Sequence, residues 1–278
     1  MPVNHLLGAG LGLLASLIPS KTRRDARVNL RLCFPELSEA ERRRLLRKVL
    51  IETGKTATEA AYIWTRSPAR LERLVVEIRG QEHLDASLAQ GRGLIIASPH
   101  LGAWELMGLY WARRLRLHSM YRPPRQQEYE ALLTWVRERS GAELLPATPA
   151  GIRRMYRALT EGHVAGILPD QEPPEAGVFA PLFGQPAKTM TLLAKLSQRS
   201  GAPVIFGFAE RLPWARGYRI HFLPAGPEIA DPDPERAAAA LNRMVEACVQ
   251  IAPAQYQWTY RRFRRQPDGR NPYHGQPL

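Results

Sequence analysis

The sequence predicts an α/β protein with a mostly parallel central sheet flanked by helices, preceded by a helical N-terminal extension. From Val75 onward, short apolar runs alternate with segments of helical periodicity, and this alternation is typical of a parallel sheet covered on both faces. Before about Arg73, only helical periodicity is found. Because no linker or internal repeat divides the 278 residues, we expect one structural domain, made of a helical region 1–73 and an α/β core 74–278.

The individual elements can be placed in order along the chain. Ser38-Glu39-Ala40-Glu41 is a capping-box sequence, which predicts the start of a long helix that runs through Trp64. Apolar runs predict strands at 75–78, 94–98, 117–121, 143–146, 164–168, 204–208 and 218–222. Helical periodicity predicts helices at 81–89, 101–115, 126–139, 149–161, 188–200 and 234–251. The stretch 169–186 has no regular period, which predicts a long apolar loop over a site.

The N-terminus carries a weakly apolar stretch at residues 6–19. It is shorter than the ~20 residues that a helix needs to span a bilayer. The basic run Lys21-Thr22-Arg23-Arg24 follows it and would suit an anionic membrane surface. We therefore expect an interfacial or re-entrant membrane anchor, and a buried core helix is the alternative.

The charge of the chain favours anionic partners. The formal net charge is +13, and only five of the 39 basic residues are lysines. The planar guanidinium of arginine suits phosphate and carboxylate groups. The alternative is that the arginines form a solvated surface and bind no specific partner. The two cysteines, Cys33 and Cys248, argue against a disulfide framework or a zinc ribbon. The histidines show no metal-ligand spacing, so we expect no metal.

His100 and Glu105 are the first candidates for chemistry. His100 follows the predicted strand 94–98, so it should lie at the carboxyl end of a strand, where open α/β sheets place their sites. On one helix the two side chains would point roughly 140° apart, but they can meet if the glutamate lies in the first turns of the next helix. An imidazole can take a proton from a hydroxyl near neutral pH, and a carboxylate on its other ring nitrogen fixes the tautomer. The alternative is a half-buried histidine that caps the helix.

Arg122 and Asp170 follow two other predicted strands. An arginine at that edge of the sheet can bind a phosphate or carboxylate through charge-assisted hydrogen bonds. A surface arginine before a proline turn would give the same pattern. Asp170 could hold an arginine or help to position a substrate, and an N-cap or turn role is its alternative.

The C-terminal segment 255–265 interleaves aromatic side chains with four arginines. This composition could stack on nucleic-acid bases, or it could lie at the head-group level of a membrane. Because no helix–turn–helix, RNP-like strand or zinc finger accompanies the segment, we expect a membrane surface and no nucleic acid.

Several blocks of the chain resemble motifs of the bacterial lipid A biosynthesis acyltransferases of the lauroyl/myristoyl type, and they occur in the same order as in that family. That family belongs to the larger His-x4-Asp/Glu glycerolipid acyltransferase superfamily, and the resemblance covers about residues 23–273. The blocks are Asn29 to Ser38, Pro99 to Glu105, Tyr121-Arg122-Pro123, Pro169-Asp170-Gln171 with Phe183-Gly184 and Thr189, and Ala252 to Trp258 followed by Arg261-Arg262-Phe263.

The resemblance implies a monomeric O-acyltransferase that needs no cofactor and acts at the cytoplasmic face of the inner membrane. It implies transfer of a fatty acyl chain from acyl carrier protein to a hydroxyl of a lipid A precursor, with His100 as the general base and Glu105 as its orienter. Further substrate-binding residues implied by the matching blocks are Arg122, Asp170, Gln171, Tyr121 and Trp104. No serine lies in a Gly-x-Ser-x-Gly context, which agrees with direct transfer and no acyl-enzyme.

The chain also departs from the family pattern. Ala103 stands where the family commonly has asparagine, Leu182-Phe183 replaces a pair of phenylalanines, and the usual N-terminal transmembrane helix is missing or shortened to 6–19. One alternative is an acyltransferase that acts on another glycolipid or a lysophospholipid and uses acyl-CoA. The alternative of another class is a non-catalytic basic protein that binds membranes or nucleic acid.

Overall fold

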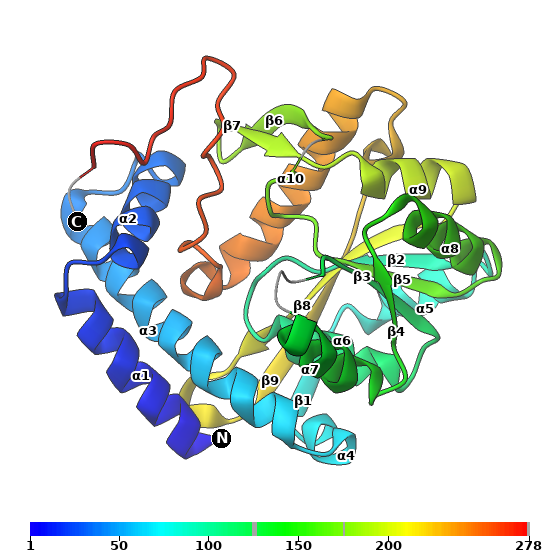
Figure 1. The fold of residues 1–278 in the computed structure, drawn as a ribbon, viewed down its shortest axis with the longest axis horizontal. Coiled ribbons are helices and arrows are strands. Elements are labelled where there is room, and N and C mark those ends of the chain that lie inside the picture. Colours follow the sequence, from blue (N-terminus) through cyan, green and yellow to red (C-terminus); the bar gives the residue numbers. More distant parts are fainter. Residues whose placement is uncertain (124–126, 175, 277–278) are drawn as a thin grey trace.

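The computed structural model describes residues 1–123, 127–174 and 176–276, and its ribbon is drawn in Figure 1. A seven-stranded sheet forms the centre, with the strand order β1-β9-β8-β2-β5-β3-β4. Neighbouring strands are parallel except β8 and β9, which are antiparallel. The prediction of a mostly parallel α/β sheet with helices around it is therefore confirmed.

The strands lie close to their predicted positions. Those of the main sheet are β1 Val75–Arg79, β2 Leu94–Ala97, β3 Leu117–Tyr121, β4 Glu143–Pro146, β5 Val164–Ile167, β8 Val204–Arg211 and β9 Tyr218–Pro224. The last two are longer than predicted because they pair with each other as an antiparallel hairpin beyond the parallel part of the sheet.

The helices of the core follow the same pattern. They are α5 Gln81–Leu88, α6 Trp104–Ala112, α7 Gln127–Glu138, α8 Pro149–Thr160, α9 Leu192–Ser200 and α10 Pro234–Ile251. The predicted start of one helix at residue 126 lies outside the described residues. Two helices begin later than predicted, α6 by three residues and α9 by four, because the chain before each one is used in a turn or a strand.

Side chains of the central strand β2 alternate between two hydrophobic cores. Ile95 and Ala97 face the core that includes α8, α9 and α10, whereas Leu94 and Ile96 face the core that includes α5 and α6. All four side chains are buried, as expected for a parallel strand covered on both faces. The sheet is therefore the middle layer of three.

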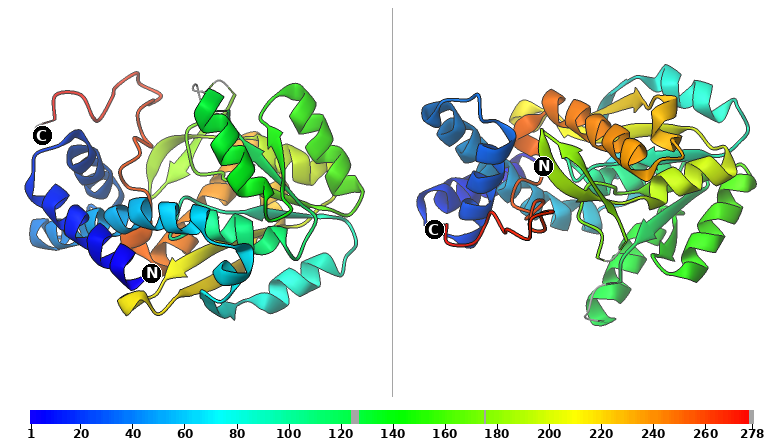
Figure 2. Two further views of the ribbon diagram at one scale, coloured as in Figure 1. Left: turned by 60° about the horizontal axis from the view of Figure 1, so that its bottom comes forward. Right: turned by 90° about the horizontal axis from the view of Figure 1, so that it is seen from above.

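Four helices precede the sheet, namely α1 Pro2–Leu17, α2 Lys21–Cys33, α3 Glu39–Thr65 and α4 Pro68–Glu72. Helix α3 begins with the predicted capping box, in which Ser38 and Glu41 satisfy each other's backbone amides. In both views of Figure 2, α1 and α2 lie at one end of the molecule, far from α8, and α3 runs from that end toward the middle.

Helix α1 packs on α3 through glycines. A Cβ atom on Gly12 would lie 2.2 Å from the carbonyl oxygen of Leu50, and one on Gly54 would lie 2.1 Å from that of Gly8. The two backbones therefore approach so closely that only glycine fits at the contact, which is a packing mode common between membrane helices.

The outer face of α1 is apolar and exposed. Leu6 and Leu17 are 75% and 71% exposed, and the face continues through Val3, Leu7, Leu11, Leu14 and Ile18. Within the described residues, no helix taken singly has the length and hydropathy to cross a membrane, and α1 with α2 meets that test only as a pair bent by 81°.

The prediction of a structureless loop at 169–186 is wrong in its second half. Strands β6 Val178–Leu182 and β7 Gln185–Thr189 form an antiparallel hairpin, turned at Phe183 and Gly184, which both have positive φ. The hairpin packs against α10, where Asn242 donates to the carbonyl oxygen of Pro181 at 2.9 Å. Prolines and glycines interrupt these short strands, so the sequence lacks the alternation of apolar and polar residues that would have predicted them.

The prediction that the aromatic side chains of 255–265 face a membrane is also wrong. Tyr256, Trp258 and Phe263 are buried in the same core as α10. The buried guanidinium of Arg262 donates to the carbonyl oxygen of Lys188 at 2.8 Å and to the hydroxyl of Thr189 at 3.0 Å. This segment is therefore part of the hydrophobic core and supports the fold from within.

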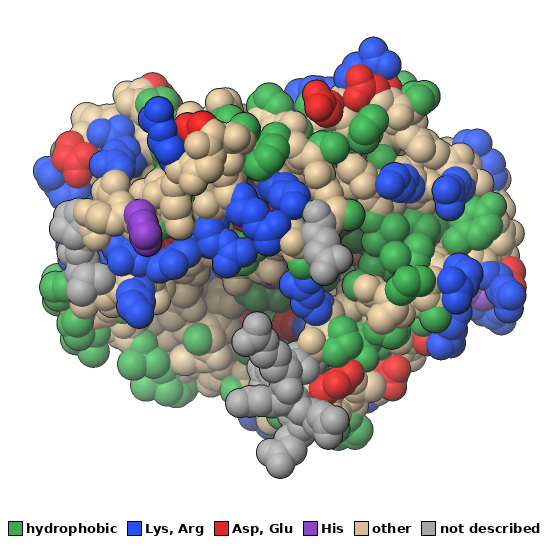
Figure 3. Space-filling view, turned by 45° about the horizontal axis from the view of Figure 1, so that its top comes forward, with side chains coloured by type: hydrophobic (Ala, Val, Ile, Leu, Met, Phe, Trp, Pro, Cys, Tyr) green, Lys and Arg blue, Asp and Glu red, His purple; other side chains and the backbone are tan. Residues whose placement is uncertain are grey.

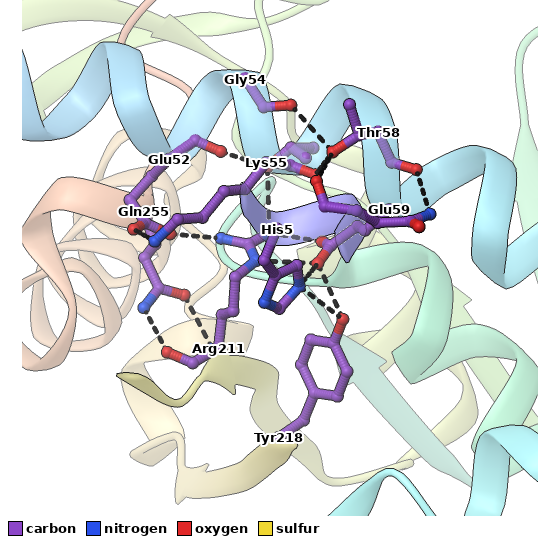
Figure 4. A network of polar contacts seen from close by, with 11 residues as sticks. His5, Glu52, Gly54, Lys55, Thr58, Glu59, Arg211, Tyr218 and Gln255 are labelled. Atoms are coloured by element: carbon purple, nitrogen blue, oxygen red, sulfur yellow. Dashed lines mark hydrogen bonds and ion pairs between the residues drawn. The ribbon is translucent and has the colours of Figure 1, made fainter. Parts of the chain in front are cut away.

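A buried polar network ties the N-terminal helices to the β8–β9 hairpin (Figure 4). Arg211 of β8 donates to Glu59 of α3 at 2.8 Å and to Glu52 at 2.7 Å. Glu59 also accepts from the hydroxyl of Tyr218 at 2.8 Å and lies 3.3 Å from the imidazole of His5 on α1. Burial alone would raise the pKa of Glu59, but the charge and hydrogen bonds of Arg211 outweigh it and lower that pKa to about 2.

This network predicts a specific pH dependence of stability. Because the pKa of Glu59 is lower in the folded state than its ordinary value of 4.5, its contribution is complete above that value and is lost as the pH falls toward 2. We expect Glu59→Gln to lower the free energy of unfolding at pH 7 by about 3–5 kcal/mol, since it breaks a buried ion pair. The variant should also lack about 2 kcal/mol of the loss that the parent protein shows between pH 7 and pH 3.

Urea unfolding of both proteins at the two pH values measures these quantities. Glu82→Gln, at an exposed position, is the control for the change of charge alone. Equal pH dependence of Glu59→Gln and the parent protein would contradict the assignment.

Candidate functional site

The loop after β2 holds His100 by backbone contacts on both sides. The amide of Gly102 donates to the carbonyl oxygen of Gln255 at 3.1 Å, and the amide of Gln257 donates to the carbonyl oxygen of His100 at 3.0 Å. Gly102 has a φ of +61°, and a Cβ atom there would lie 2.1 Å from the carbonyl oxygen of Ala209. Glycine is therefore required where the loop crosses β8.

His100 is paired with Asp170. Its Nδ1 lies 2.8 Å from Oδ1 of Asp170, and its backbone amide donates to Oδ2 at 2.9 Å. The pairing follows from the register of the sheet, because Ala97 of β2 is opposite Ile167 of β5 and each chain continues three residues to reach the site. The carboxyl ends of these two adjacent parallel strands thus bring the imidazole and the carboxylate together.

The electrostatics of this pair fix the imidazole tautomer. Burial raises the pKa of Asp170, but the charge of His100 and two hydrogen bonds from it outweigh burial, so the pKa is below its usual value of 3.8. An ionised Asp170 accepts the proton of Nδ1, which leaves Nε2 as the basic nitrogen. The imidazole is 16% exposed and the carboxylate 2% exposed, so only the histidine reaches the surface of the site.

The prediction that Glu105 contacts His100 is wrong. Glu105 lies in the first turn of α6, and its two carboxylate oxygens accept from Arg137 of α7 at 2.6 and 3.2 Å. Trp104, the residue before it, makes the edge contact with the imidazole, with ring centroids 5.4 Å apart. The chain enters α6 only at Trp104, so Glu105 is directed toward α7 instead of back toward the loop.

An open groove of about 1530 Å³ lies in front of the imidazole. The groove is lined by His100 and by four of the predicted substrate-binding residues, namely Trp104, Tyr121, Arg122 and Gln171. The amide nitrogen of Gln171 lies 3.3 Å from Nε2 of His100 and donates to Oε1 of Gln257 at 2.9 Å. The side of the histidine that carries the basic nitrogen therefore faces the groove.

Asp170 does not reach the groove, contrary to its prediction as a substrate-binding residue. It lies behind the imidazole, where it contacts His100. The pKa of the buried Tyr256 is raised mainly by burial and also by the charge of Asp170. The sequence placed Asp170 correctly at a strand end but gave no strand order, and only the order shows that β5 is the neighbour of β2.

Among the described residues, no group of three or more His, Cys, Asp or Glu side chains is arranged to hold a metal ion. The chemistry that the site offers is that of a base: an imidazole held by a buried carboxylate, open to a groove with apolar and basic walls. Such an arrangement can remove a proton from a hydroxyl bound in the groove.

Comparison with known proteins gives a consistent result. Residues 1–265 match the sequence profile of a family described as bacterial lipid A biosynthesis acyltransferase. The chain is 35% identical to the lipid A biosynthesis lauroyltransferase of Escherichia coli (strain K12) over 272 residues, which is 96% of this chain and 87% of that protein. It is 29% identical to the palmitoleoyltransferase of the same pathway and strain over 96% of this chain and 87% of that enzyme. For the myristoyltransferase of that strain the identity is 26%, over 95% of this chain and 82% of the relative.

The profile spans the helical N-terminus, the His100 loop, the Asp170 turn and the buried C-terminal segment, so it covers every element that builds the site. The chain belongs to the bacterial lipid A biosynthesis acyltransferase family and is an acyltransferase.

Proposed function

We propose that this protein transfers a fatty acyl chain from an acyl carrier protein thioester to a hydroxyl of a lipid A precursor, with His100 as the general base. The observation that carries the proposal is the His100–Asp170 pair at the edge of the groove, with Nε2 directed into it. Family membership supports the acyl transfer and the class of acceptor.

The proposed reaction needs no covalent acyl-enzyme. Nε2 of His100 takes the proton of the acceptor hydroxyl as its oxygen attacks the thioester carbonyl carbon. The tetrahedral intermediate then collapses, the carbon–sulfur bond breaks, and the leaving thiolate takes the proton back from the imidazolium. Asp170 stabilises the imidazolium and holds the ring, so it is the positioning residue in place of Glu105. General-base assistance of this kind contributes about 10²–10⁴-fold in rate.

The remaining groove residues are assigned to binding. The exposed guanidinium of Arg122 follows β3 at the same sheet edge and is suited to an anionic group of the substrate. Trp104 and Tyr121 offer apolar surface beside the imidazole, and Gln171 lies where an acceptor hydroxyl must approach Nε2.

We further propose that the protein acts at the cytoplasmic face of the inner membrane, with the outer face of α1 lying in the lipid interface. The exposed leucines of α1 form an apolar face that is unusual for a helix in water. Lys21 begins the next helix and can contact anionic head groups.

A donor other than acyl carrier protein is the second candidate. The groove is large and open, and its cationic side chains would accept the phosphates of acyl-CoA as readily as an acidic carrier protein. The two donors can be compared as thioesters of the same fatty acid, one on acyl carrier protein and one on coenzyme A. Lipid A precursor is the acceptor, and mass spectrometry measures the product formed from each donor. No product with either donor would contradict the proposed function.

The proposed mechanism predicts that Asp170→Asn lowers kcat by about 10²–10⁴-fold, because the neutral amide no longer selects the basic Nε2 tautomer. His100→Asn should lose at least as much. Glu105→Gln should change kcat by less than about 10-fold, because it alters only a partly exposed ion pair with Arg137. Steady-state kinetics on the three purified variants measures this order.

Thermal unfolding of the same variants separates catalytic loss from loss of the fold. A larger kinetic defect in Glu105→Gln than in Asp170→Asn, at equal stability, would return the role of orienter to Glu105.

The proposed membrane contact predicts that Leu6→Gln, Leu11→Gln and Leu17→Gln together reduce binding to anionic vesicles by more than 10-fold. Burying one leucine side chain is worth about 1.5–3 kcal/mol, so loss of three exceeds that threshold. Flotation with vesicles measures the bound fraction, and Leu132→Gln with Ile251→Gln is the control at exposed apolar positions elsewhere. Equal flotation of the triple variant and the parent protein would rule out this face as the anchor.

A further inference from the structure

A second chemical feature lies in the same groove, away from His100. Helices α8 and α9 both line it, and their apolar side chains Ile152, Tyr156, Leu192 and Leu196 form its floor there. Figure 3 shows this part as a green hollow at the right of the view, with blue side chains on both sides. The hydroxyl of Tyr156 donates to the backbone carbonyl oxygen of Arg199 at 3.3 Å, which links the two helices across the floor.

The walls beside this floor are basic. Arg153 and Arg157 line the groove from α8, and Lys195 and Arg199 line it from α9. All four are exposed, and none forms an ion pair with any carboxylate in the described parts of the chain. Arg154, between the first two, differs because it lies outside the groove lining and pairs with Glu143.

The spacing of these cations lowers the stability of the fold when no anion is bound. Each helix carries its pair at positions i and i+4, where like charges are neighbours and repel. Both pairs line the same groove, on two helices that contact each other, so the repulsion adds up. A bound anion would relieve it, and the apolar floor would hold a hydrocarbon part of the same molecule.

We infer that the α8–α9 part of the groove, built from Arg153, Arg157, Lys195 and Arg199, binds the phosphate groups of the acceptor lipid. Four cations match a phosphate monoester or a pair of phosphates better than the single negative charge of a phosphodiester in a carrier arm. The apolar floor fits a lipid acceptor with chains beside its phosphorylated head group. The inference rests on the proposed function for the identity of the ligand.

Equilibrium binding tests this site without any need for turnover. All proteins carry His100→Asn, and the probes are a lipid A precursor in detergent micelles and the same lipid after phosphatase treatment. The test variant is Arg157→Ala with Lys195→Ala, one from each wall. The matched control is Arg154→Ala with Arg243→Ala, which removes the same charge from exposed positions outside the groove lining.

We expect the test variant to bind the phosphorylated lipid at least 10-fold more weakly than the control and to bind the dephosphorylated lipid equally well. Equal affinities of the two variants for the phosphorylated lipid would overturn the site. A second pair of probes, an acyl phosphopantetheine thioester and the acyl pantetheine without phosphate, examines the donor. A defect confined to the phosphorylated donor would overturn the assignment to the acceptor.

The outcomes also separate this inference from the proposed function. Phosphate-dependent binding through these side chains, in a parent protein that transfers no acyl group to the same lipid, would support the site and contradict the function. Acyl transfer by a protein whose test variant binds normally would support the function and contradict the site.

Discussion

The site depends on the parallel pairing of β2 with β5. Ala97 and Ile167 are opposite each other in the register, and three residues beyond them the chain places His100 and Asp170 2.8 Å apart. If one of the two strands slipped by one residue, its side chains would move to the other face of the sheet, and His100 and Asp170 would no longer meet. The two completely covered faces of β2 make such a slip costly, because its apolar side chains are specific to two different cores.

Parts of the chain distant in sequence hold this geometry from behind. The C-terminal segment hydrogen-bonds the His100 loop through Gln257, and Asn29 of α2 in turn donates to the carbonyl oxygens of Trp258 and Tyr260 at 2.6 and 2.7 Å. Several of the sequence blocks that resemble the family are therefore structural supports of the loop. Their polar side chains are buried and satisfied by backbone partners, which makes them rigid and hard to replace.

Much of the fold could be predicted from the sequence because its strands are short apolar runs separated by amphipathic helices. The strand order could not be, since it depends on packing between distant elements, and this is why Asp170 was not matched to His100. Glu105 was misplaced because the start of α6 was predicted three residues early, and about 100° of rotation per residue makes such an error decisive. The burial of Trp258 was not predicted, because composition alone does not distinguish an aromatic side chain in the core from one that faces a membrane.

The basic groove and the apolar face of α1 make physical sense together with the base. The groove offers an acceptor with hydrocarbon chains and phosphates an apolar surface, cations left unpaired among the described residues and one proton acceptor, and the exposed apolar face of α1 lies outside it. The sequence indicated the excess of arginine, but only the folded chain distinguishes an arginine held in an ion pair outside the groove, such as Arg154, from the groove-lining Arg153 and Arg157.

The central claim is that the carboxylate on Nδ1 of His100 is that of Asp170. Nitrogen-15 NMR of the imidazole, assigned by comparison with His100→Asn, tests it most directly. The structure predicts that the neutral imidazole carries its proton on Nδ1 and none on Nε2, with this tautomer kept in Glu105→Gln and lost in Asp170→Asn. A protonated Nε2 in the parent protein, or a tautomer that responds to Glu105→Gln and not to Asp170→Asn, would contradict the account.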